Sequence, residues 1–403
     1  MNRILFLFFL YTPDKLLHVC LSIAAYFRSI LRVILHYRLD VERYTGIYNG
    51  KPVTVGWIGT GEMKDYILKT FYVEKEQVTK LPTAKLLNVK KTIAEMTNSC
   101  DIIYVEQFSI LPPLKKFKRI KPDLNTLMAV NDLHNIGSIH STQKRRRRDR
   151  ETQKLIEKSG IVYKEYEIAR HPEKLRLFYD QLYAPHISAN YGGSRVEPFK
   201  WMQIFYAKGF LRLAYDNGKV ISGSLFLKNN NTLTWCKYGV SDSSNKLHRA
   251  SSSIHMHLKY AKELKLKYFS AFHTKPFLND GGFRYKRECG LGVLRESRNY
   301  YCDRDVYIKV INYRSGVADF LHENPFIFEN NGKLFASLLC TDESKDLPSK
   351  IIEQYTRYRT AGIHQYQVHI KRELTPSEKE TISKQCGLSG DGNRLTFLTY
   401  NLK

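Results

Sequence analysis

Several common sequence signatures are missing from this 403-residue chain. Its seven cysteines are scattered and include no CxxC pair, which argues against a disulfide framework and a zinc site and favours a reducing compartment. The P-loop, HExxH and GxSxG motifs are absent, so nothing in the sequence supports a hydrolase. Low-complexity tracts and short repeats are absent as well. We therefore expect a globular protein whose function requires no metal.

Long uncharged apolar runs are also missing. A membrane-spanning helix needs about 20 such residues, and no run approaches that length. The N-terminal segment 1–37 is apolar and aromatic, but Asp14 and Lys15 separate its apolar runs Ile4–Tyr11 and Leu16–Phe27. This interrupted pattern favours a helix lying in the membrane interface. Ordinary buried helices, a signal peptide and a true span are the alternatives.

Acidic residues are few in comparison with basic ones. The chain has 39 acidic and 64 basic residues, a net charge of +25 and a pI of about 9.6. Such a charge attracts polyanions, namely nucleic acid, anionic lipid or phosphorylated carriers, although a generally basic proteome would also produce it. Five consecutive cations, Lys144–Arg148, begin a predicted helix. They indicate either an anionic partner or a solvated helix face.

The central third of the chain has a distinctive order of elements. Alternating apolar residues and the turn Asp216-Asn217-Gly218 predict a β-hairpin, and a second turn leads to a third strand. A polar loop, a helix and a further strand follow. The predicted elements are strands at 211–215, 220–227 and 232–238, a helix near 249–264, a strand near 268–272 and a glycine-rich turn within 276–290.

This order resembles the GNAT acyltransferase superfamily and, within it, the FemAB-like branch. That branch includes enzymes that transfer aminoacyl groups in peptidoglycan cross-bridges and the CelD-type proteins of polysaccharide synthesis. The matching residues are Gly218–Gly223, Ser241–Leu264 and Pro276–Gly290, within a similarity that extends over roughly 137–305. The resemblance implies an α/β fold of tandem GNAT-like domains, with mixed β-sheets flanked by helices, after an apolar N-terminal helix.

The alternation of strands and helices before residue 140 agrees with a first, incomplete domain of this kind. The sequence places a strand at 53–58, helices at 62–71 and 90–97, and a strand at 102–107. The predicted organisation is an apolar segment 1–37, an incomplete GNAT-like domain 38–140, a GNAT-like acyltransferase domain 141–305 and an α/β extension 306–403.

The resemblance also implies a donor site. In GNAT folds the pyrophosphate of the acyl donor lies on backbone amides at a helix start, where the helix dipole is positive. The corresponding residues here are Arg249, Ala250, Ser251, Ser252 and Ser253. Unlike the usual superfamily pattern, they include no glycine. The implied donor is acyl-CoA, with aminoacyl-tRNA as the alternative. If these residues bind no donor, they are part of an ordinary Ser-capped helix.

Further predicted site residues flank this helix in the sequence. Lys286, which follows Tyr285 as in the family, would stabilise negative charge in the transition state, and His273 and Asp280 are candidate proton acceptors. The resemblance implies that the loop within 183–195 borders the acceptor cleft. The predicted acceptor-binding residues are His186, Tyr191, Arg195 and Tyr285. The alternatives are that Lys286 is a solvated lysine beside a packed aromatic, Tyr285, and that His186 is a structural histidine.

The sequence therefore predicts an acyltransferase that moves an acyl or aminoacyl group to an amine or hydroxyl of a cell-envelope or polysaccharide precursor. We expect it in the cytoplasm, peripheral on the inner membrane face. One alternative is a catalytically inactive GNAT-like protein that binds nucleic acid or an anionic membrane through its basic surface. A second is a membrane-associated structural partner of a polysaccharide assembly machine.

Overall fold

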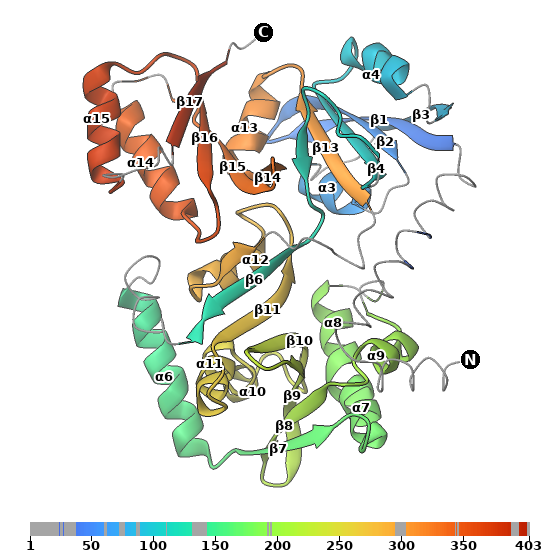
Figure 1. Cartoon of the computed structure of the whole chain (residues 1–403), viewed down its shortest axis with the longest axis vertical. Helices are drawn as coiled ribbons and strands as arrows, with labels where there is room; N and C mark the ends of the chain where they lie inside the picture. Colours follow the sequence, from blue (N-terminus) through green and yellow to red (C-terminus); the bar gives the residue numbers. More distant parts are fainter. Residues whose placement is uncertain are drawn as a thin grey trace. The chain divides into compact units, whose positions relative to one another are not determined.

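The protein folds into two compact units of mixed α/β structure (Figure 1). The computed structural model describes residues 24, 27, 38–59, 63–71, 77–85, 89–109, 111–130, 143–191, 193, 196–294, 304–342, 344, 346–387 and 395–400. Of these, unit 1 contains Asn125–His273 and Tyr285–Gly292, and the rest belong to unit 2.

The predicted N-terminal segment 1–37 lies outside the described residues, except for Ala24 and Phe27. Within the part of the chain that the structure describes, no helix has the length and apolar character needed to cross a membrane.

Unit 1 is built on a seven-stranded mixed sheet. Its order is β12 (Gly292–Leu294), β6 (Leu124–Ala129), β11 (Tyr268–Thr274), β10 (Thr232–Val240), β9 (Lys219–Lys228), β8 (Phe210–Asp216) and β7 (Val162–Glu167). The strands β6, β11 and β12 have end residues that belong to unit 2. Strands β7 to β10 are antiparallel, and β11 is parallel to β10. The predicted hairpin is confirmed: Asn217 and Gly218 have φ angles of 47° and 76°, as a type I′ turn requires.

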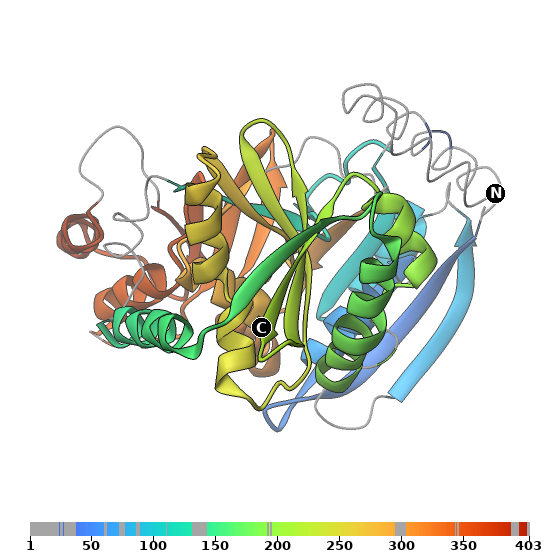
Figure 2. The same cartoon turned by 90° about the horizontal axis from the view of Figure 1, so that it is seen from below.

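Helices cover both faces of this sheet because its strands alternate their apolar side chains. On β9, Leu225 packs with Phe178 on one face, whereas its neighbour Phe226 packs with Leu258 on the other. Figure 2 shows α7 and the α10–α11 pair on opposite sides of the strands. The helices are α6 (Gln143–Ser159), α7 (Pro172–Phe178), the π-helical turn η3 (Tyr179–Tyr183), α8 (Ala184–Tyr191), α9 (Phe199–Phe205), α10 (Lys246–Ser251), α11 (Ile254–Glu263) and α12 (Gly281–Glu288).

Unit 2 contains a ten-stranded mixed sheet. Its order is β17 (Leu395–Thr399), β16 (Gln365–Ile370), β15 (Lys333–Leu339), β14 (Phe326–Asn330), β5 (Lys118–Ile120), β13 (Arg304–Val310), β4 (Ile102–Phe108), β2 (Lys51–Gly59), β1 (Arg38–Tyr48) and β3 (Gln77–Lys85). Its helices are α3 (Lys64–Phe71), α4 (Val89–Thr97), α13 (Ser315–Glu323), α14 (Leu347–Tyr358) and α15 (Pro376–Gln385).

The strands expected in a separate C-terminal extension, 306–403, therefore share a sheet with those of the expected first domain, 38–140. They do so because β13 pairs with both β4 and β5. Large aromatic side chains fix this arrangement: Trp57, Tyr104 and Phe320 are fully buried in one core. Such burial stabilises each side chain by about 1.5–3 kcal/mol.

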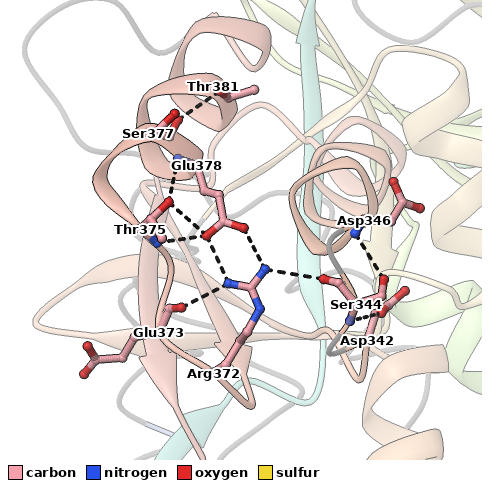
Figure 3. Close-up of polar contacts among 9 residues, drawn as sticks. All are labelled: Asp342, Ser344, Asp346, Arg372, Glu373, Thr375, Ser377, Glu378 and Thr381. Carbon is pink, nitrogen blue, oxygen red and sulfur yellow. Dashed lines mark hydrogen bonds and ion pairs between the residues drawn. The ribbon is translucent and has the colours of Figure 1, made fainter.

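Helix α15 begins with a capping box, which Figure 3 shows. The Thr375 hydroxyl accepts a hydrogen bond from the Glu378 amide, and the Glu378 carboxylate accepts one from the Thr375 amide. The Arg372 guanidinium also donates to Glu378, and this contact, with the Thr375 amide, lowers the pKa of Glu378 to about 2. The carboxylate therefore stabilises the fold above its unfolded pKa near 4.5, and this stabilisation is lost as the pH falls toward 2.

Replacing Thr375 by alanine is expected to lower the free energy of unfolding by about 1 kcal/mol, because the Glu378 amide in the first turn of α15 loses its cap. Chemical denaturation measures this change. Ser377→Ala, two positions further on at an exposed site, is the matched control and should change stability by less than about 0.5 kcal/mol. Equal effects of the two substitutions would contradict the capping role.

Candidate active site

The site in unit 1 begins where two parallel strands separate. Strands β10 and β11 pair only through Thr232–Thr234 and Tyr268–Ser270. Beyond this point β10 contains a β-bulge between Trp235 and Lys237, opposite β9. Bulges redirect side chains and end regular pairing. Beyond Thr234, the edge of β10 that faces β11 is therefore no longer paired with it.

The helix predicted near 249–264 is interrupted. Asn245 caps α10 by accepting from the Leu247 amide at 2.9 Å, and α10 ends at Ser251. Ser252 leaves the helical conformation, and Ser253 is extended (φ −76°, ψ 155°) at the N-cap of α11. Of the predicted donor residues, Arg249, Ala250 and Ser251 thus end one helix, because a run of serines favours caps over helix interiors. Only Ser252 and Ser253 precede a helix start.

The predicted donor residues differ in exposure. The guanidinium of Arg249 donates to the carbonyls of Ser243 and Ser244, so it closes the polar loop. Ala250 and Ser251 are buried, and the Ser251 hydroxyl lies 2.5 Å from that of Ser222 on β9. Ser251 therefore fixes α10 to β9 and Arg249 fixes it to the polar loop, while the predicted role of all three residues in donor binding stays a prediction.

The start of α11 has the features of an anion site. The first amides of a helix have no intrahelical acceptor, and the helix dipole is positive there. The Ser253 hydroxyl is buried at this end and has no hydrogen-bond partner among the described residues. The Tyr285 hydroxyl accepts from the Ile254 amide at 3.4 Å. Tyr285, predicted to bind the acceptor, therefore lies at the predicted donor helix.

The end of β11 is held in an unusual conformation. Phe272 has a φ angle of 56°, a left-handed value that costs a bulky residue about 1–2 kcal/mol. Hydrogen bonds hold it there: the Phe272 amide donates to Ser270 Oγ at 3.2 Å, and Thr126 Oγ1 donates to the Phe272 carbonyl at 2.9 Å. Such over-determined strain is typical of functional positions.

The predicted residues His273 and Lys286 meet at this bend. The Lys286 ammonium donates to the backbone carbonyl of His273. The imidazole of His273 packs against the Phe272 ring, with centroids 3.9 Å apart. Lys286 therefore fixes the backbone that presents His273, which is a positioning contact, while its predicted role with the oxyanion stays a prediction.

Asp280 belongs to unit 2, whereas His273 and Lys286 belong to unit 1. Its Oδ1 accepts from the Phe283 amide at 2.9 Å, as a helix cap does. Its Oδ2 accepts from the Tyr66 hydroxyl at 3.0 Å. The glycine-rich turn predicted around Gly281 is instead the first turn of α12. Both oxygens of Asp280 therefore have structural partners.

The predicted acceptor loop is helical. The π-turn η3 packs so closely on β10 that a Cβ at Gly239 would lie 2.4 Å from the Leu182 backbone. His186 follows on α8, buried, with its Nδ1 3.2 Å from the Asn190 amide nitrogen. Burial lowers the pKa of His186. π-Turns are frequent at functional sites, and the acceptor role predicted for this segment stays a prediction.

Two other predicted acceptor residues are less fully described. Tyr191 is the last residue of α8, and Arg195 lies outside the described residues.

The sequence did not reveal the side chains that hold the bend. Thr126 lies on β6, whose alternating buried residues Leu124, Thr126 and Met128 are a strand signal that our prediction missed. Ser270 lies on a predicted strand, but a single serine in a strand gives no sign of its partner. Such contacts depend on the tertiary fold.

Other concave features do not contain the predicted residues. A pocket of about 670 Å³ in unit 2 lies between α13, α14 and the end of β15, where Cys340, Asp342 and Arg357 contribute to its lining. Within the described residues, no three His, Cys, Asp or Glu side chains are grouped as a metal site.

No protein-family model matches the sequence, and no curated protein matches it. Several solved structures are similar to the fold. FemX is 11% identical over 77% of this chain and 96% of that protein, with a TM-score of 0.36. The C-terminal DUF2156 domain of a protein from Agrobacterium fabrum is 11% identical over 72% and 91%, with a TM-score of 0.32. A GCN5-related N-acetyltransferase from Sphaerobacter thermophilus is 10% identical over 64% and 73%, with a TM-score of 0.26. All three scores are below 0.5, so the proposals below depend on the chain's own residues.

Proposed function

We propose that unit 1 is an acyltransferase that moves an acyl or aminoacyl group from an activated donor to an amine or hydroxyl. The observation that supports this most is the bend at Phe272. It lies at the end of β11, on the strand that parts from β10, and it holds His273, whose two ring nitrogens are buried, on a backbone that Thr126, Ser270 and Lys286 fix. Rigid positioning of this kind is what transfer between two bound substrates requires.

The donor in this proposal is an acyl-CoA. Its pyrophosphate would lie at the start of α11, where Ser253 offers a buried hydroxyl and where the first amides of the helix, one of which donates to Tyr285, have no intrahelical acceptor. The separated strands would accommodate the pantetheine arm, whose amides need backbone partners. Aminoacyl-tRNA is the alternative donor, because its phosphates and its aminoacyl ester could lie at the same two places, the start of α11 and the separated strands.

The chemistry is a nucleophilic acyl substitution. The acceptor nitrogen or oxygen attacks the donor carbonyl, and the thiolate leaves and is protonated. His273 would take the proton that the acceptor loses. Backbone amides would stabilise the oxyanion. An amine or hydroxyl of a cell-envelope or polysaccharide precursor stays the predicted acceptor.

Replacing Ser253 by aspartate tests the donor site. Aspartate and asparagine are equally good helix N-caps, so Ser253→Asp and Ser253→Asn should both fold, and they differ by one charge. We expect calorimetry with acetyl-CoA and longer acyl-CoAs to show affinity at least about tenfold weaker for the aspartate variant, because its carboxylate repels the pyrophosphate. The asparagine variant should bind nearly as the natural protein does.

Equal acyl-CoA affinity in the two variants would place the donor elsewhere. Binding of no CoA species, together with charge-sensitive binding of aminoacyl-tRNA, would identify the other donor. Binding of neither would contradict the proposed function.

A further inference from the structure

A second pocket, of about 200 Å³, lies within unit 2 and has a buried lysine in its lining. Lys118, the first residue of β5, donates from its amine to Ser337 Oγ on β15 at 2.9 Å. The same amine lies 3.0 Å from His369 Nε2 on β16. Because β14 lies between β5 and β15, the side chain crosses that strand, with its amine 4.6 Å from the centroid of the Phe328 ring.

The charge in this pocket is of one sign. Lys116 and Lys309 also line it, and no aspartate or glutamate does so in the described part of the chain. The nearby acids on β13 and β14, Asp305 and Glu329, contact Arg119 and Lys121 instead. A buried ammonium without an anion is unfavourable, and burial accordingly lowers the pKa of Lys118 to about 7.

Two neighbouring titratable groups, His369 and Tyr313, stay neutral near pH 7. Burial, with a smaller effect of Lys118, lowers the pKa of His369 to about 3. Burial raises the pKa of Tyr313, which packs against His369. The amine of Lys118, with its pKa lowered to about 7, therefore lies beside the Ser337 hydroxyl and a neutral imidazole in a pocket that Lys116 and Lys309 also line.

The remaining lining is apolar and includes Leu321, Phe326 and Leu338. We propose that this pocket binds a small monocarboxylate, whose carboxylate pairs with Lys118 and Ser337 and whose hydrocarbon part packs against these three side chains. The two polar groups match the two carboxylate oxygens, and the apolar walls and small volume do not suit a phosphate ester. This site is independent of the acyl-transfer function proposed for unit 1.

Binding at this site should take up protons. The carboxylate pairs with the ammonium form of Lys118, which is about half populated at pH 7 when the pKa is about 7. Binding raises that pKa, so about half a proton should be taken up per ligand at pH 7. Affinity should be highest below pH 7 and fall as the pH rises above it.

The test is calorimetry of the full chain with acetate, butyrate and hexanoate at pH 7, in two buffers of different ionisation enthalpy. Lys118→Met keeps the side-chain length and removes the charge, and we expect it to weaken butyrate binding at least about tenfold. Lys116→Met, at an exposed position of the same pocket, is the matched control and should weaken it less than about threefold.

The proton count is a second readout that needs no variant. Uptake of about half a proton by the natural protein supports the pairing with Lys118. Saturable binding without proton uptake, equal affinity in Lys118→Met, or no binding of any of the three acids at millimolar concentrations would overturn the proposal. Inorganic phosphate that binds as tightly as butyrate would overturn it as well.

Discussion

Replacing His273 by glutamine is expected to lower kcat for acyl transfer by about 10²–10⁴-fold, the usual contribution of a positioned general base. Glutamine keeps a polar group of similar size but cannot accept the proton of the attacking acceptor. The loss should shrink at high pH, because an acceptor amine that is already deprotonated needs no base. Steady-state kinetics over a range of pH, with the acyl-CoA that binds best, measures the effect.

A matched control is available in the same unit. His171 is partly exposed, with its Nδ1 3.4 Å from Glu173 Oε1 on the surface, so His171→Gln should leave kcat within about threefold of the natural protein. If His273→Gln behaved like this control at every pH, the transfer would proceed without a base at this position.

Replacing Asp305 by alanine is expected to lower the free energy of unfolding of unit 2 by about 3–5 kcal/mol. The Asp305 carboxylate is fully buried and accepts from Arg119 Nε and Lys121 Nζ, both at 2.7 Å. Removing it leaves two partly buried cations whose remaining acidic partner within the described residues is Glu329. At about 2–4 °C per kcal/mol, the melting temperature should fall by about 10 °C, which scanning calorimetry measures.

The control for this prediction is a pair of similar geometry at the surface. Lys51 and Asp319 are 2.6 Å apart, but the lysine side chain is 42% exposed. Lys51→Ala should therefore cost less than about 1 kcal/mol. A small effect of Asp305→Ala, comparable with that of Lys51→Ala, would show that burial does not determine the energetics of these ion pairs.

Local signals predicted much of unit 1. The residues Asp216-Asn217-Gly218 specify a type I′ turn, and the strands predicted on either side of it agree with β8 and β9 to within one residue at each end. The helix near 249–264 was only partly right, since Ser252 and Ser253 divide it. Side-chain capping competes with helix continuation at such residues, and the outcome depends on packing against the sheet.

The order of strands in unit 2 was beyond local reasoning. Strand β13 pairs with β4 across about 200 residues of sequence, and no turn signal specifies such a pairing. The tandem GNAT-like organisation stays a prediction, as do the envelope acceptor and the peripheral location. At the candidate site, the sequence proposed His273 and Lys286, whose catalytic roles stay predictions. It gave no sign of the left-handed conformation of Phe272, because the hydrogen bonds that stabilise that conformation depend on the tertiary fold.

The most direct test of the central claim is to map where an acyl donor lies. A photo-crosslinkable acyl-CoA analogue, bound to the full chain and followed by peptide mass spectrometry, should label the start of α11 near Ser253 and the end of β11 near His273. Excess acetyl-CoA should abolish the labelling. Saturable labelling confined to unit 2 would contradict the assignment of acyl transfer to unit 1.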